Sequence, residues 1–91
     1  MRTIEEIRAE LDKVDDELLS AYQKRMSLVD EMAKVKKASG VNTFSPEREK
    51  EIFSRLEKKS GALAPYVVEL YETVLATSKR YQNALREGDE V

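Results

Sequence analysis

The sequence predicts an all-α fold with one long, one short and one medium helix. The three Gly and two Pro among its 91 residues gather around residues 40–46 and 61–65, with one glycine near the end. Charged residues make up 37% of the chain, and apolar residues recur between them at spacings of three and four, as in amphipathic helices. With this length, we expect a single domain over residues 1–91.

The first helix is expected over about residues 4–38. Gly40 stands where a left-handed C-cap is favoured, and the lysines before it complement the negative end of the helix dipole. Both signals mark the end of the helix. Its apolar seam is long and consists of Ile4, Ile7, Leu11, Val14, Leu18, Ala21, Leu28, Met32 and Val35.

Two shorter helices are expected over about residues 46–59 and 64–87. Ser45 and Pro46 have the order of an N-cap and a first-turn proline. Gly61 ends the second helix, and Pro65 lies where the third begins. Their apolar positions are Ile52, Phe53 and Leu56, followed by Val67, Val68, Tyr71, Val74, Leu75 and Leu85.

The first helix is too long for a compact monomer. At 1.5 Å per residue it would measure about 50 Å, whereas a compact domain of this size has a diameter of about 30 Å. Its seam is apolar along nearly the whole length, so the overhanging part needs cover. We therefore expect an intertwined antiparallel homodimer in which the long helices cross. A monomeric three-helix bundle that folds back on itself is the alternative.

The composition excludes several classes of function. The chain has no Cys and no His, which removes disulfides, thiol nucleophiles, Cys/His zinc sites and imidazole catalysis. Its net charge of -2 does not favour nucleic acid or an anionic membrane surface. Since neither a signal peptide nor a membrane span is visible, we expect a cytoplasmic protein without a nucleic-acid or membrane partner.

Cationic residues occupy unusual positions on the first helix. Arg25 falls on the apolar seam, and Lys36 follows about 16 Å along the axis and about 20° around it. The two side chains can converge on one anion, although solvent or a carboxylate would also satisfy Arg25, and the helix dipole would satisfy Lys36. Arg8 lies about 25 Å before Arg25. It would therefore serve the other subunit's site, unless it pairs with neighbouring carboxylates.

The other two helices also carry polar residues at positions that invite a ligand. Ser78 and Gln82 are four residues apart on the apolar stripe of the third helix, where bonding to backbone or water is the alternative to a function. Glu49, near the start of the second helix, suits the dipole, but Arg48 needs an anionic neighbour or ligand. Together these residues predict a small cation-rich pocket for a polyanion, in which any catalysis is electrostatic and conformational.

The order and spacing of these residues resemble the all-helical (AroQ-class) chorismate mutases over about residues 4–86. The resemblance implies an intertwined homodimer with two active sites. It also implies an isomerase that converts chorismate, a dianion, to prephenate on the route to phenylalanine and tyrosine, with no cofactor and no metal. It rests on Ile7-Arg8, the segment from Leu11 to Leu19, Arg25, Lys36, the segment from Pro46 to Glu49, Ser78 and Gln82.

The resemblance assigns the catalytic roles to four residues. Arg8 of the partner chain and Arg25 would bind the two carboxylates of chorismate, and Ser78 would assist at one of them. Lys36 and Gln82 would donate to the ether oxygen, where negative charge grows as the carbon–oxygen bond breaks.

The resemblance also implies binding residues at the start of the second helix. Glu49 would accept a hydrogen bond from the ring hydroxyl, and Arg48 would orient Glu49. Ser45 is counted with them, although many family members have Asp at this position. Two other functions remain: an isochorismate pyruvate lyase of the same fold, or a regulatory or dimerisation module without activity. Glu49 favours the mutase, and the retention of every site residue argues against the module.

Overall fold

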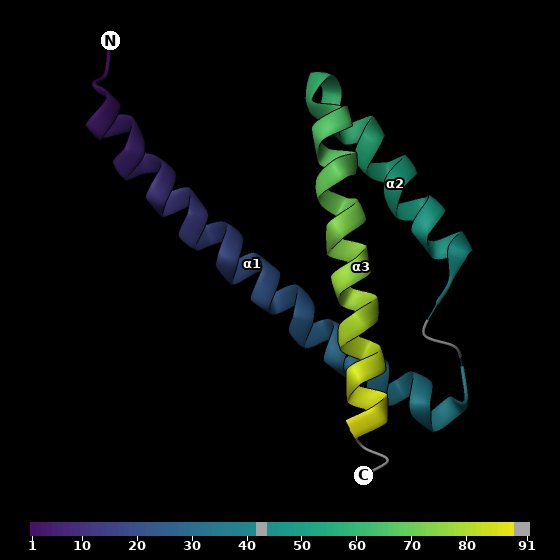
Figure 1. Cartoon of the computed structure of the whole chain (residues 1–91). Helices are drawn as coiled ribbons and strands as arrows, with labels where there is room; N and C mark the ends of the chain where they lie inside the picture. Colours follow the sequence, from purple (N-terminus) through teal and green to yellow (C-terminus); the bar gives the residue numbers. More distant parts are fainter. Residues whose placement is uncertain (42–43, 89–91) are drawn as a thin grey trace.

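The computed structural model describes residues 1–41 and 44–88, and its architecture is all-α, as the sequence predicts. Three α-helices follow one another: α1 (Ile4–Ser39), α2 (Pro46–Ser60) and α3 (Ala64–Gly88). A short 3₁₀ turn, η1 (Gly61–Leu63), joins α2 directly to α3, so that the two helices form a hairpin (Figure 1). Over the described ranges, no helix has the length and apolar character needed to cross a membrane.

The helix ends follow from local capping chemistry. α1 begins with a capping box, in which the Thr3 hydroxyl accepts from the Glu6 backbone N–H at 3.2 Å and the Glu6 carboxylate accepts from the Thr3 N–H at 3.4 Å. It ends at Gly40, whose φ of 71° lies in the left-handed region that glycine adopts without strain. The Ser45 hydroxyl caps α2 by accepting from the Arg48 N–H at 3.3 Å.

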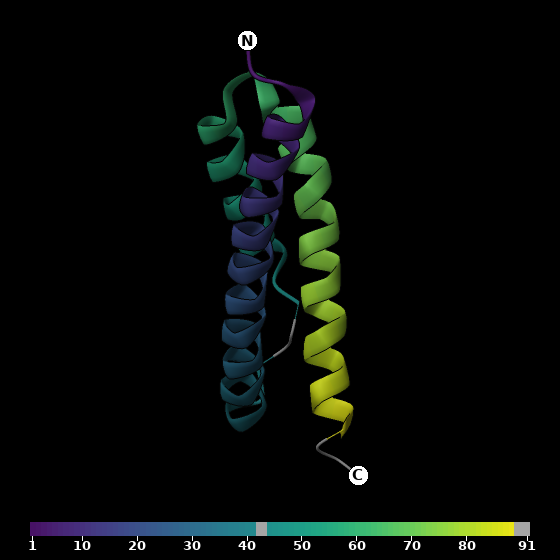
Figure 2. The ribbon, with the colours of Figure 1, turned by 90° about the vertical axis from the view of Figure 1, so that its left-hand side faces the viewer.

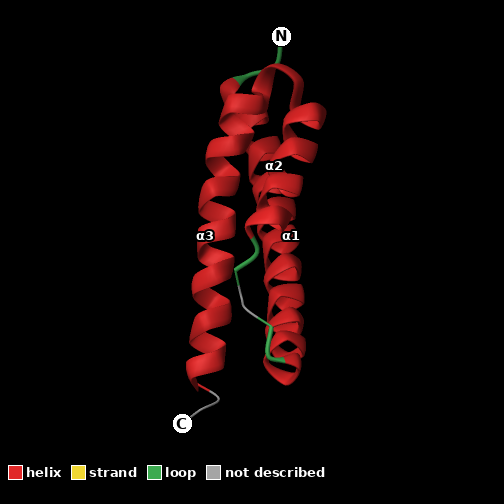
Figure 3. Cartoon of the chain, turned by 90° about the vertical axis from the view of Figure 1, so that its right-hand side faces the viewer, coloured by secondary structure: helices red, strands yellow, loops and turns green. Residues whose placement is uncertain are grey.

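α3 lies at the centre of the fold, because both α1 and α2 pack against it. Views from two opposite sides place α1 and α2 on the same side of α3 (Figure 2, Figure 3). α1 crosses α3 with its C-terminal half, and its N-terminal half diverges from the α2–α3 hairpin (Figure 1). The molecule is therefore flat and open, with principal extents of 56 × 29 × 15 Å.

The core is small and lies where α3 meets the other two helices. Its buried apolar residues are Val29, Ala33, Ile52 and Leu75. A hydrogen bond of 2.6 Å between the Tyr22 and Thr77 hydroxyls ties α1 to α3. Tyr22 is the donor, since the Thr77 hydroxyl already donates to the Val74 carbonyl at 3.0 Å.

The apolar seam of α1 is not the face that packs within the chain. α1 buries Val29 and Ala33, whereas the seam residues Leu28, Met32 and Val35 remain at least half exposed. Every residue in the first half of α1 is exposed as well. One chain therefore leaves the seam uncovered, as the length of the helix leads us to expect.

The chain exposes more surface than a compact monomer of its size. Its radius of gyration is 16.8 Å, against about 12 Å for a compact domain of 91 residues. Its accessible surface is 7427 Å², against about 5,400 Å² for a compact monomer of 10.4 kDa. The excess is about 2,000 Å².

Candidate active site

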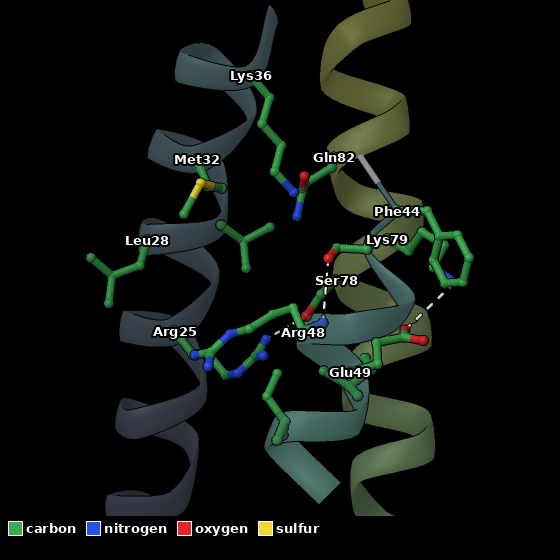
Figure 4. A pocket seen from close by; sticks show the side chains of 14 residues that line it. Arg25, Leu28, Met32, Lys36, Phe44, Arg48, Glu49, Ser78, Lys79 and Gln82 are labelled. Atoms are coloured by element: carbon green, nitrogen blue, oxygen red, sulfur yellow. Dashed lines mark hydrogen bonds and ion pairs between the residues drawn. The ribbon is translucent and has the colours of Figure 1, made fainter. Parts of the chain in front are cut away.

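A pocket of about 320 Å³ opens between α1, α2 and α3 (Figure 4). This volume is within the range of small-molecule sites. Arg8 lies in the exposed half of α1 and does not line the pocket. The other residues predicted from the sequence all line it, namely Arg25, Lys36, Ser45, Arg48, Glu49, Ser78 and Gln82.

α3 supplies a buried polar floor for the pocket. Ser78 is 6% exposed and Gln82 is 8% exposed. The Ser78 hydroxyl donates to the Val74 carbonyl at 2.7 Å and accepts from Arg25 Nη1 at 2.5 Å. Among the described residues, the buried Oε1 of Gln82 has no hydrogen-bond partner. Leaving a buried acceptor unsatisfied costs about 1–3 kcal/mol, which makes this amide an unusual feature of the interior.

α1 supplies a cationic wall. The side chains of Arg25 and Lys36 both reach from α1 toward α3 (Figure 4). The Arg25 guanidinium meets Ser78, and the Lys36 ammonium points toward the amide of Gln82. An anion between α1 and α3 would therefore meet a cation at each end of the pocket.

The first turns of α2 form the third wall. The side chain of Glu49 is 31% exposed, and its carboxylate pairs with Lys79 at 3.6 Å. Arg48 pairs at 3.2 Å with Glu51, and both of these side chains are exposed. In this chain Lys79 is therefore the ion-pair partner of Glu49, and Arg48 pairs with Glu51 while it also lines the pocket. The orienting role of Arg48 stays a prediction.

Among the aromatic and charged residues of the pocket, sequence reasoning missed Phe44 and Lys79. The Lys79 ammonium lies 4.0 Å from the centroid of the Phe44 ring. Phe44 did carry a signal, because an apolar residue just before an N-cap often packs against the start of the helix. Lys79 carried no such signal, since a lysine next to Ser78 is as typical of an exposed helix face as of a pocket.

Positive charge dominates the lining of the pocket. Four cationic side chains, including Lys79, face one carboxylate, that of Glu49. Over residues 1–41 and 44–88, no group of three or more His, Cys, Asp or Glu residues is arranged to hold a metal ion. The site is equipped to bind an anion, to restrain its conformation and to donate hydrogen bonds to developing negative charge.

Several known proteins resemble parts of the chain. The T-protein of Haemophilus influenzae is 32% identical over 71 residues, which cover 76% of this chain and 19% of the T-protein. The chorismate mutase of Methanocaldococcus jannaschii is 38% identical over 53 residues, or 58% of this chain and 54% of that protein. The bifunctional chorismate mutase/prephenate dehydratase of Aquifex aeolicus is 32% identical over 56 residues, which cover 62% of this chain and 16% of that protein. The matches thus span less than two thirds of each relative. No solved structure gives a significant match.

The family comparison covers the site as well as the fold. Residues 7–83 match the family described as Chorismate mutase type II. This stretch begins before Arg8 and ends just after Gln82, so it contains every candidate site residue that the sequence predicts. Because the match extends over most of the chain and over all three helices, the chain belongs to the chorismate mutase type II family.

Proposed function

We propose that this domain is an isomerase that rearranges chorismate to prephenate in the biosynthesis of phenylalanine and tyrosine. The observation that carries the proposal is the pair of buried polar residues, Ser78 and Gln82, opposite the cations Arg25 and Lys36. Membership of the chorismate mutase type II family supports the same reaction. Chorismate is a small dianion, and the cation-rich pocket of about 320 Å³ suits its size and charge.

Substrate binding relies on charge. Arg25 binds one carboxylate, and it retains further N–H donors because its bond to Ser78 uses only Nη1. The Ser78 hydroxyl now donates to the Val74 carbonyl, so it must rotate to donate to the substrate. Arg8 of the partner chain would bind the other carboxylate. With both carboxylates held, the enolpyruvyl side chain stays over the ring in the diaxial arrangement that reacts.

Transition-state stabilisation falls to Lys36 and Gln82. Their polar ends approach each other from opposite walls of the pocket (Figure 4). Donation from both to the ether oxygen counters the negative charge that grows as the carbon–oxygen bond breaks. Since Gln82 is buried, its amide acts in a region of low dielectric, where such a donor is worth more than in water.

Glu49 accepts a hydrogen bond from the ring hydroxyl of chorismate. Its carboxylate lies at the pocket edge formed by α2. Ser45 lies next to it in the pocket, but its hydroxyl already caps α2 through the Arg48 N–H. Ser45 therefore contributes mainly by fixing the start of α2, and Arg48 adds positive charge near the substrate.

We further propose that the active form is an intertwined antiparallel homodimer. The excess surface of about 2,000 Å² in each chain would give a total interface of about 4,000 Å², which is typical of obligate homodimers. The exposed seam of α1 supplies the apolar part of that interface. The exposed seam residues in the first half of α1 are Ile4, Ile7, Leu11, Val14 and Leu18.

A largely apolar groove between α1 and α3 supports the same assembly. Its volume is about 540 Å³, and Leu18, Leu70 and Val74 are among its lining residues. Arg25 lines both this groove and the pocket, so a partner helix in the groove would lie next to the site. Arg8 is about 25 Å from Arg25 along the same helix. It would therefore complete the partner's pocket, not its own.

A turnover assay tests the proposed reaction. Purified protein should remove the diene absorbance of chorismate, and NMR should identify the product as prephenate, which has the same mass. Arg25→Ala protein, purified in the same way, controls for a contaminating host enzyme and should be inactive. Salicylate and pyruvate from isochorismate, with no prephenate from chorismate, would instead support the lyase. No turnover of either compound would support a module without activity.

A further inference from the structure

Lys79 stands at the junction of three segments beside the pocket. It belongs to α3, yet its ammonium lies 3.6 Å from Glu49 Oε1 on α2 and 4.0 Å from the ring centroid of Phe44, which precedes α2. The Lys79 side chain is 40% exposed and that of Glu49 is 31% exposed. Figure 4 shows Lys79 between the aromatic ring and the carboxylate. All three side chains line the pocket.

The two partners of Lys79 hold special positions around the cap of α2. Ser45 is the N-cap, so Phe44 is the residue before the cap and Glu49 is the fourth residue of the helix. In many helices these two positions are apolar and pack together as a hydrophobic staple. A carboxylate cannot pack on a phenyl ring in this way. Lys79 joins the two instead, through a cation–π contact on one side and an ion pair on the other.

The neighbouring cation does not replace Lys79 in this arrangement. Arg48 pairs with Glu51 instead, and both of these side chains are exposed. Without Lys79, nothing in these contacts would keep the Glu49 carboxylate at the pocket edge or the Phe44 ring against α3.

We infer that Lys79 is a positioning residue, which fixes the Glu49 carboxylate and the Phe44 ring at the edge of the pocket so that Glu49 can accept the substrate hydroxyl. This inference rests on the proposed function, since Lys79 acts on chorismate through Glu49. The ring hydroxyl is not altered by the rearrangement. Its hydrogen bond is therefore as strong in the ground state as in the transition state, and losing it raises KM while kcat changes little.

Kinetics with chorismate give the first test. Lys79→Gln removes the charge but keeps a polar side chain only one atom shorter, and it should raise KM about tenfold with kcat within about twofold of wild type. Lys79→Arg should restore most of the affinity. Lys50→Gln removes the same charge from an exposed lysine of α2 that does not line the pocket, and it should leave both constants unchanged.

A double substitution tests whether Lys79 acts through Glu49. In a Glu49→Gln background, Lys79→Gln should raise KM by less than about threefold, because the carboxylate that it holds is gone. A full tenfold rise in that background would overturn the inference. So would wild-type constants for Lys79→Gln, or a loss confined to kcat.

Fluorescence gives a second test that does not depend on chorismate. The chain has no Trp, so Phe44→Trp introduces a single reporter. Lys79→Gln in this background should increase acrylamide quenching about twofold as the ring leaves α3, whereas Lys50→Gln should not. Unchanged quenching would overturn the inference even if the enzyme is active. If wild-type protein fails to turn over chorismate, the proposed function fails, and the quenching still decides whether Lys79 holds residue 44.

Discussion

Replacing Leu11 by Asp should dissociate the proposed dimer and abolish turnover. Leu11 lies on the exposed seam of α1 and is 53% exposed in one chain. Burying about half of a leucine contributes about 1 kcal/mol, and two-fold symmetry doubles this to about 2 kcal/mol per dimer. An unpaired carboxylate at an interface adds a further penalty in each subunit. The dissociation constant should therefore rise at least about 10³-fold.

Sedimentation velocity at micromolar concentration measures this change directly. Wild-type protein should have twice the chain mass of 10.4 kDa, and the Leu11→Asp variant should have the mass of one chain. Turnover should be lost with the dimer, because Arg8 no longer reaches the partner's pocket. Ser20→Asp is the matched control, since Ser20 is exposed and lies about 180° around α1 from Leu11. It adds the same charge and should change neither mass nor turnover.

Three results would contradict parts of this reasoning. A wild-type mass near 10.4 kDa at micromolar concentration would remove the dimer. A Leu11→Asp dimer with the wild-type dissociation constant would show that the seam is not the interface. A monomeric Leu11→Asp variant with full turnover would agree with the proposed interface but would contradict the role of Arg8 in the partner's site. Circular dichroism separates dissociation from loss of helix.

Three further predictions concern the site and the cap of α2. Gln82→Ala should lower kcat about 10²–10³-fold with a smaller change in KM, because its amide donates where charge develops. A rise in KM with kcat unchanged in steady-state assays would contradict this. Arg8→Ala and Arg25→Ala should each be inactive, yet their mixture should recover about a quarter of wild-type turnover, since half of the dimers are mixed and each of these has one intact site. No recovery despite subunit exchange, followed by mass spectrometry, would rule out a shared site. Ser45→Ala should lower the free energy of unfolding in urea by about 1 kcal/mol, whereas Ser45→Asp should preserve the cap; similar losses for both would be the contrary result.

The helix ends were predictable because a few local residues set them. Gly40 adopts the left-handed C-cap that its position indicated, and Ser45 caps α2 with Pro46 in the first turn. These choices depend on the backbone groups of one turn and on no distant contact. The all-α architecture follows from the same local signals, together with the periodicity of the apolar residues.

The lining of the pocket was predictable in part, because polar residues on apolar helix faces are unusual. Ser78 and Gln82 stood out on the stripe of α3, and both are buried. Arg25 stood out on the seam of α1, and it bonds to Ser78 across the crossing of the two helices. Each anomaly was visible on a single helix, before the helices were brought together.

The pairing between side chains was not predictable, since it depends on how the helices cross. Lys79 and Glu49 are thirty residues apart, and no local pattern connects them. The same limit applies to the packing face of α1, which buries Val29 and Ala33 and leaves Leu28 exposed. Periodicity gives the direction of an apolar stripe, but the partner on that stripe is a property of the assembled fold.

Ser78 and Gln82, two of the few buried residues in the described part of the chain, limit how this domain can evolve. Well-packed apolar side chains at both positions would remove polar groups from the interior and favour thermal stability. The same exchange would leave an inert helical bundle. Selection for heat resistance alone would therefore work against the catalyst, and gains in robustness have to accumulate at helix caps, loops and outer surfaces.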